Sequence, residues 1–241
     1  MSKVIIGFDR ALRPEWLDLA AATVLRGDDR TTAQDRLTAE LRSDISAPEA
    51  LEKTVRVILR IWHPEDAAGV RARDEAATLI GEVDEAERLS LHWGLTVLAY
   101  PFFRHIASVV GRLSRLEPTF SVAQVHKRLV GEYGDTALVE RARRHVIRTL
   151  TDWGMCESAG QKGVYRVAPQ RTISDLRVQR WLLQITLQAN ETEARQMDGL
   201  IAAPEMFPWD FSSEIAQIVR DERFETAVSG DGRRTVTLAS A

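Results

Sequence analysis

The sequence predicts a mainly α-helical protein with two short β-hairpins, one in the middle of the chain and one at its C-terminal end. Apolar residues recur at helical spacing over most of the 241 residues. Two segments instead show short strand-like runs on either side of a glycine-containing turn, at 155–167 and 224–238. We therefore expect three regions, a helical domain over 1–116, a mixed region over 117–170 and a helical C-terminal region with a β-hairpin over 171–241.

The composition indicates a folded globular protein, with 44% hydrophobic and 28% charged residues. Because the formal net charge is -3, any affinity for a polyanion must come from a local cluster of cations. The single cysteine, Cys156, excludes an internal disulfide and suits a reducing compartment, so we expect a cytoplasmic protein. We expect no signal peptide and no membrane insertion, since the apolar stretch Leu91 to Val110 contains Pro101 and two basic side chains.

In the N-terminal region, apolar stripes predict helices near 11–26, 31–42 and 48–62. Pro48 suits a first helical turn, and His63 followed by Pro64 ends the third helix. The acidic run 82–87 has two interpretations, a solvated helix face, which we favour, or a protein-docking face. A long apolar helix follows from about Leu89 to Leu116, and Pro101 should kink or break it.

The central region 117–170 has the pattern of a winged helix-turn-helix. Ser121 can cap a first helix whose apolar side chains share one face, and the segment 131–135 supplies a turn. A second helix over about 136–153 carries its own apolar stripe. Two short strands around the glycine-containing turn 159–163 would form the wing.

The second helix of this region also carries a basic ridge opposite its apolar stripe. Its members lie three, four and seven residues apart, so they project together: Arg141, Arg144, His145 and Arg148. The segment from Glu117 to Arg171 contains nine Lys and Arg against six Asp and Glu, or +3, which leaves -6 for the rest of the chain. We expect DNA binding here, with Arg144 and Arg148 in the groove and Lys162 and Arg166 on phosphate. A solvated arginine face and a protein-docking module are the alternatives.

The C-terminal region should contain a helix through Trp181, a second helix to Ala203, and a short helix to about Asp221 that Ser212 or Ser213 caps. The hairpin over 224–238 would turn at Gly230, Asp231 and Gly232. The aromatic segment 207–211 contains Trp209, which we expect to be an exposed contact for a protein partner.

No catalytic, metal or cofactor site is expected. The five histidines are scattered without a supporting carboxylate or cysteine at metal-ligand spacing, and Cys156 has no neighbouring base. The chain also lacks a phosphate-binding glycine loop and a nucleophile elbow. The sequence therefore predicts a protein that is not an enzyme.

In its layout the chain resembles the BrxA family of BREX phage-defence systems. The resemblance covers the N-terminal helices up to Trp62, the apolar helix from Leu91, the helix-turn-helix core, and the segment Phe207-Pro208-Trp209 with the hairpin that follows it. It implies a largely helical, non-catalytic component that binds double-stranded DNA beside other defence proteins. No family DNA-contact residue can be carried over beyond the positions given above.

Three functions stay open on this basis. The first is a sequence-tolerant DNA-binding accessory protein of a bacterial antiviral system. The second is an interaction module that uses the winged helix and Trp209 to hold a partner protein. The third is a ligand-sensing transcription regulator, which would need a pocket among the N-terminal helices and a dimer.

Overall fold

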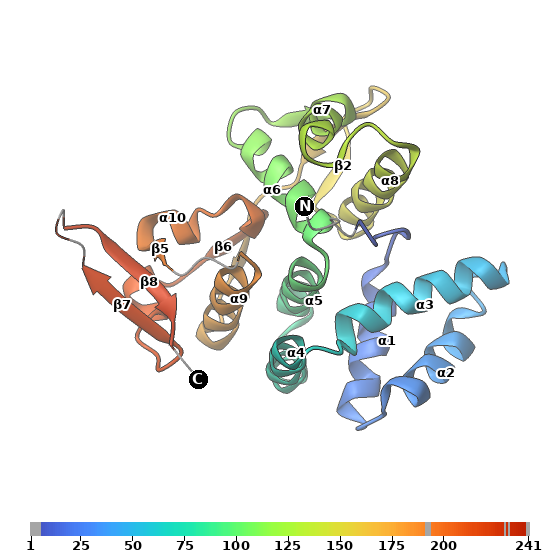
Figure 1. The fold of residues 1–241 in the computed structure, drawn as a ribbon, viewed down its shortest axis with the longest axis horizontal. Helices are drawn as coiled ribbons and strands as arrows, with labels where there is room; N and C mark the ends of the chain where they lie inside the picture. The colour runs from blue at the N-terminus through green and yellow to red at the C-terminus, as the bar shows by residue number, and fades with distance from the viewer. Residues whose placement is uncertain (1–5, 191–193, 229, 231, 240–241) are drawn as a thin grey trace.

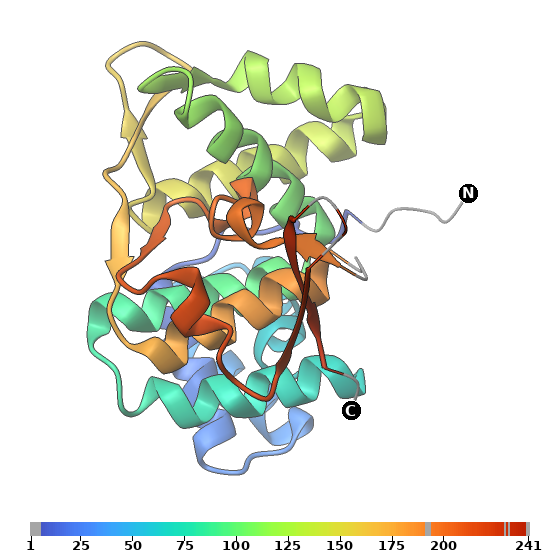
Figure 2. The same ribbon diagram turned by 90° about the vertical axis from the view of Figure 1, so that its left-hand side faces the viewer.

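Over the residues that the structure describes, the protein is mainly helical, with three small sheets. The computed structural model describes residues 6–190, 194–228, 230 and 232–239, and within them there are 11 α-helices. In Figures 1 and 2, the N-terminal helices lie at one end of the molecule, and α7, α8 and the strands beside them lie at the other. The C-terminal region packs along their side.

Six helices build the first part of the chain. They are α1 (Pro14–Leu25), α2 (Arg30–Leu41), α3 (Pro48–Trp62), α4 (Ala67–Ile80), α5 (Glu85–Ala99) and α6 (Pro101–Ser114). The first three lie close to the predicted ranges, and Pro48 stands in the first turn of α3 as expected. Pro101 divides the long apolar segment into α5 and α6, because Tyr100 before it takes an extended conformation.

The central region combines two helices with a three-stranded antiparallel sheet. Its elements are β1 (Thr119–Ser121), α7 (Val122–Tyr133), α8 (Ala137–Asp152), β2 (Cys156–Ser158) and β3 (Val164–Val167), with strand order β1-β3-β2. Ser121 accepts a hydrogen bond from the Gln124 amide, and the Gln124 side chain accepts one from the Ser121 amide. This reciprocal capping fixes the start of α7. Gly134, at φ 77°, ends the helix in a conformation that suits glycine.

The C-terminal region is built on one long helix and two small sheets. Its elements are β4 (Arg171–Ile173), α9 (Leu176–Ala189), β5 (Arg195–Gln196), α10 (Met197–Ile201), the 3-10 turn η1 (Pro204–Met206), β6 (Trp209–Phe211), α11 (Ile215–Ile218), β7 (Phe224–Val228) and β8 (Arg234–Leu238). Strands β7 and β8 pair antiparallel, and β5 adds to the edge of β8. Strands β4 and β6 pair in parallel.

Two expectations for this region were wrong. The helix expected to reach Ala203 is only the five-residue α10, and α11 has four residues. Glu214 rather than Ser212 or Ser213 precedes α11, and no side chain caps that helix. Asp231, in the predicted hairpin turn, lies outside the described residues, as do positions 1–5 of the N-terminus.

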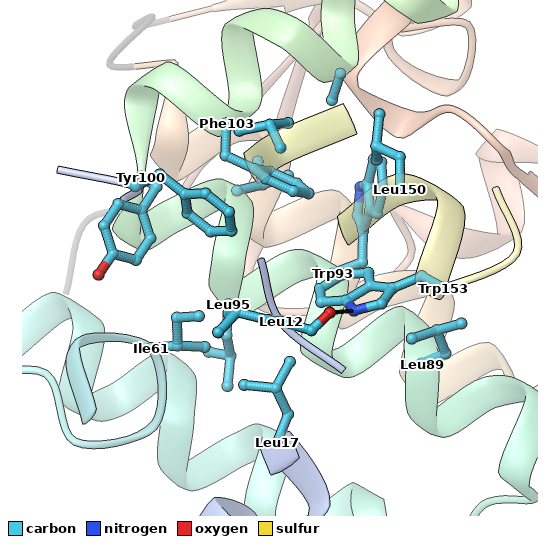
Figure 3. Close-up of a cluster of buried hydrophobic side chains, with 14 of the residues drawn as sticks. Leu12, Leu17, Ile61, Leu89, Trp93, Leu95, Tyr100, Phe103, Leu150 and Trp153 are labelled. Carbon is cyan, nitrogen blue, oxygen red and sulfur yellow. Dashed lines mark hydrogen bonds between the residues drawn. The ribbon is translucent and has the colours of Figure 1, made fainter. Parts of the chain in front are cut away.

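An aromatic cluster joins the N-terminal segment to the central helices (Figure 3). The ring of Trp153 at the end of α8 lies 5.9 Å from that of Phe103 and 6.2 Å from that of Trp93, between centroids. Its indole Nε1 donates to the Leu12 carbonyl at 3.0 Å, and the Leu12 amide donates to the Thr149 hydroxyl at 3.0 Å. These bonds hold α8 against the chain that precedes α1.

The acidic run 82–87 is partly exposed, and two of its side chains bind segments that are distant in sequence. Asp84 caps α5 by accepting from the Glu87 amide at 2.8 Å. The buried Glu87 carboxylate accepts from the amides of Ser174 and Asp175, at 2.6 and 2.9 Å. Glu82 forms an ion pair with Arg177 on α9. The expectation of a wholly solvated face was wrong for this run, because Glu87 is buried against a distant segment.

Substitution of Gly111 by alanine is expected to lower the free energy of unfolding by about 1–3 kcal/mol. A Cβ at this position of α6 would lie 2.1 Å from the Pro204 carbonyl oxygen, and backbone cannot move aside as a side chain can. The measurement is a urea denaturation curve.

The matched control is Gly131→Ala in α7, where a Cβ would meet no atom within 4 Å. Helix propensity predicts that this change raises stability by about 0.5–1 kcal/mol. Equal effects of the two substitutions would contradict the close packing of η1 on α6.

Acidification is expected to destabilise the fold through buried histidines. His63, which hydrogen-bonds with Thr23 at 2.7 Å, is buried, and burial together with Arg73 and Arg30 lowers its pKa to about 4. Burial also lowers the pKa of His92, although Asp18 opposes the shift. A histidine whose folded pKa lies below its unfolded value contributes full stability above the unfolded pKa of about 6.5, and this is lost as pH falls toward the folded pKa.

For His63 the expected loss between pH 7 and pH 4.5 is about 2 kcal/mol of unfolding free energy. The control is His63→Gln, which removes this titration. The stability difference between wild type and variant should therefore shrink as pH falls, when both are measured by urea denaturation. A difference that stays constant over this range would refute the buried neutral state of His63.

Candidate nucleic-acid interface

Helix α8 has one buried face and one cationic face. Thr136 caps it by accepting from the Val139 amide at 3.3 Å. The apolar side chains at positions 139, 142, 146 and 150 are all buried. On the opposite side three arginines are exposed, and we call them the α8 arginine row: Arg141, Arg144 and Arg148. Spacings of three and four residues align them on one helix face, as the sequence predicts.

Most of the charge in the α8 arginine row is unpaired. Arg148 pairs with Asp152 at 2.8 Å, one turn further along the helix, and its side chain remains 68% exposed. Within the described part of the chain, Arg141 and Arg144 have no ion pair. An exposed pair such as Arg148 with Asp152 is weak and screened by salt, so a phosphate can compete for this guanidinium.

His145 does not belong to the exposed row, which corrects the prediction. Its side chain is half-buried, whereas the three arginines are exposed. Burial lowers its pKa below 6.5, and the nearby Arg10, Arg144 and Arg141 lower it further. His145 is therefore mainly neutral at pH 7 and adds no charge to the surface.

Arg143 links the two helices of the central region through a hydrogen bond. Its side chain is buried on the apolar side of α8, and Nη1 donates to the Val122 carbonyl at 3.1 Å. Because it holds α8 against the start of α7, it fixes the direction in which the α8 arginine row points.

The strands β2 and β3 place two further cations near α8. Lys162 is exposed in the connection between them, and Arg166 is exposed on β3. Arg166 pairs with Glu157 on β2 at 3.3 Å, and because both side chains are exposed this pair is weak, like that of Arg148 with Asp152. The Val122 amide donates to the Gly163 carbonyl at 2.8 Å, which fastens the connection to the first turn of α7.

Trp209 is not an exposed partner contact, which overturns that expectation. The residue lies on β6 with only 4% of its surface exposed. Its ring packs edge-on against Trp93, with centroids 6.4 Å apart. The parallel pairing of β6 with β4 draws it into the main core.

A comparison of the chain with protein-family models, with curated proteins and with solved structures finds no match. The geometry of the site therefore carries the functional argument. Across the described ranges, no helix is long and apolar enough to cross a bilayer, and no group of three or more His, Cys, Asp or Glu side chains is placed to hold a metal ion.

Cys156 is a small buried residue, with 3% of its surface exposed. Its burial raises the pKa of the thiol to about 11. At neutral pH the group is therefore a protonated thiol rather than the thiolate that nucleophilic chemistry needs.

Sequence reasoning missed one feature beside the interface. A cleft adjoins the α8 arginine row at Arg141 and extends to α3, which is remote in sequence. The one sequence signal for this cleft is the helical spacing of Lys53, Arg56 and Arg60, which places them on one side of α3. The cleft itself depends on packing between distant segments.

Proposed function

We propose that residues 117–170 form a winged helix-turn-helix through which the chain binds double-stranded DNA without catalysing a reaction. In this proposal α8 enters the major groove, and Arg144 and Arg148 reach the DNA from it. Lys162 and Arg166 contact the phosphate backbone from the β2–β3 connection and from β3. No cofactor is needed.

The order of elements supports the proposed module. Helix α7, the turn at Gly134, the basic helix α8 and the antiparallel pair β2 and β3 follow one another as they do in that class of DNA-binding domain. The strand β1 closes the sheet beside the pair, so the connection at Lys162 is held close to the helices.

The observation that carries the proposal is the exposure of the α8 arginine row on a helix whose other face is buried. Three guanidinium groups on one rigid helix can each contact phosphate or a base edge, and phosphate contacts gain affinity by releasing counterions. The rest of the chain carries a net charge of -6, which disfavours contact of DNA with other faces. Because phosphate contacts carry no sequence information, binding should be tolerant of sequence.

The resemblance in layout to the BrxA family supports a role as an accessory protein in phage defence. A protein-docking module was the main alternative, and it relied on Trp209 as an exposed anchor. The burial of that side chain removes this support. A ligand-responsive regulator of DNA binding is a second candidate, because the cleft beside Arg141 lies among the N-terminal helices.

The test is an electrophoretic mobility shift with random-sequence duplex DNA at low salt. A retarded complex is expected, and an unrelated duplex should compete for the protein as well as the labelled one does. Absence of a complex at low salt would overturn the proposal.

A further inference from the structure

A cleft of about 760 Å³ lies between α3, the segment 6–10 and the start of α8. Its volume falls in the range of sites for small molecules. Buried apolar side chains form part of its wall: Phe8, Val57, Ile61, Leu95 and Tyr100. Such a surface suits an aromatic or aliphatic group of a ligand.

Cations outnumber acids around the cleft. The basic side chains come from four parts of the chain: Arg10, Arg30, Lys53, Arg56, Arg60 and Arg141. The acids are Asp9, Glu65 and Asp66. Asp66 is engaged in capping α4, Arg30 pairs with Glu65 at 3.4 Å, and Arg56 pairs with Asp9 at 3.7 Å. Lys53 pairs with Glu49 on its own helix.

Three arginines of the cleft have no ion pair with any residue that the structure describes: Arg10, Arg60 and Arg141. The guanidinium carbon of Arg60 lies 5.0 Å from the centre of the Tyr100 ring, and this contact orients it. Arg141, which lines the cleft from α8, is exposed. Three arginines from separate parts of the chain thus line the cleft with their charges unpaired among the described residues, which favours an anion as the ligand.

Two buried polar atoms of residues that line this cleft have no hydrogen-bond partner among the residues that the structure describes. Arg10 donates from Nη1 to the Asp9 carbonyl at 2.7 Å, but its Nε has no acceptor. The Oδ1 atom of Asp9 has no donor. Buried polar groups in folded proteins nearly always have partners. The hydrogen-bonding capacity of Arg10 and Asp9 is therefore not fully used within the described protein.

We propose that this cleft binds an organic phosphate of nucleotide size. The phosphate would lie among Arg10, Arg60 and Arg141, because the guanidinium fork matches phosphate oxygens. A hydroxyl or amino group of the ligand would donate to Asp9, and the base would lie on the apolar wall. The ligand is either a free nucleotide or an unpaired nucleotide of a single strand, which share this chemistry. The proposal does not depend on duplex binding.

The experiment is isothermal titration calorimetry on the full chain with ADP, adenosine, inorganic pyrophosphate and a short oligothymidylate. ADP or the oligothymidylate is expected to bind, and whichever binds identifies the source of the nucleotide. Adenosine and pyrophosphate should each bind at least about tenfold more weakly. Adenosine lacks the phosphate groups, and pyrophosphate lacks the base.

Variants locate the binding to the cleft. Arg60→Gln is expected to weaken binding of the nucleotide at least about tenfold, through loss of a charge-assisted hydrogen bond. Arg71→Gln, an exposed position of α4 outside the cleft, should leave binding unchanged.

Three results would overturn the proposal: no binding of ADP or oligothymidylate, pyrophosphate binding as tightly as ADP, or equal weakening by the two substitutions. Arg60 lies outside the α8 arginine row, and the calorimetry contains no duplex DNA. Failure here is therefore distinct from failure of the proposed duplex binding.

Discussion

Replacement of both Arg144 and Arg148 by glutamate is expected to lower the affinity for duplex DNA by roughly a hundredfold or more. Each change removes a charge-assisted contact and places a carboxylate against phosphate. Both side chains are exposed, so the fold should tolerate the substitutions within about 0.5 kcal/mol. Affinity is measured by fluorescence anisotropy with a labelled random-sequence duplex.

The matched control changes the same total charge away from α8. Arg42 and Arg71 are exposed on the N-terminal helical region, and their replacement by glutamate should alter affinity far less. Circular dichroism establishes that both double variants are folded. If the two double variants lose affinity equally, net charge rather than the α8 arginine row governs binding.

Replacement of Trp153 by alanine is expected to lower the free energy of unfolding by about 3–5 kcal/mol. The side chain is almost fully buried against Phe103 and Trp93, and its removal leaves a large cavity. It also removes the donor to the Leu12 carbonyl, which becomes an unsatisfied buried acceptor. Urea denaturation monitored by circular dichroism provides the measurement.

Trp153→Phe separates packing from hydrogen bonding, because it keeps an aromatic ring and loses only the indole donor. Its loss of stability should be clearly smaller than that of Trp153→Ala. A loss below about 1 kcal/mol for the alanine variant would contradict the packing shown in Figure 3.

Local signals in the sequence were sufficient for the first three helices, for the break at Pro101, for the two central helices and for the α8 arginine row. Pro101 ends one helix and starts the next through its fixed backbone geometry, which depends only on neighbouring residues. Ser121 caps α7 through an amide three positions away. The exposed positions 141, 144 and 148 follow from helical periodicity once the apolar face is identified.

Features that depend on distant segments could not be predicted in this way. Trp209 looked like an exposed aromatic until β6 paired with β4, about 40 positions earlier in the chain. Glu87 looked like part of a solvated run, but its carboxylate binds amides 87 and 88 positions away. His145 has the spacing of the α8 arginine row, yet it is half-buried, and Arg10 and Asp9 of the N-terminal segment lie near it. Each outcome is decided by packing between segments rather than by local pattern.

The most direct test of the account is the salt dependence of duplex affinity for the wild type and for Arg144→Ala. If Arg144 contacts phosphate, the logarithm of the binding constant should fall linearly with the logarithm of salt concentration, and the slope for the variant should be shallower by about 0.9. Identical slopes together with identical affinities of the two proteins, or a wild-type affinity that salt does not change, would contradict the claim that the α8 arginine row binds DNA.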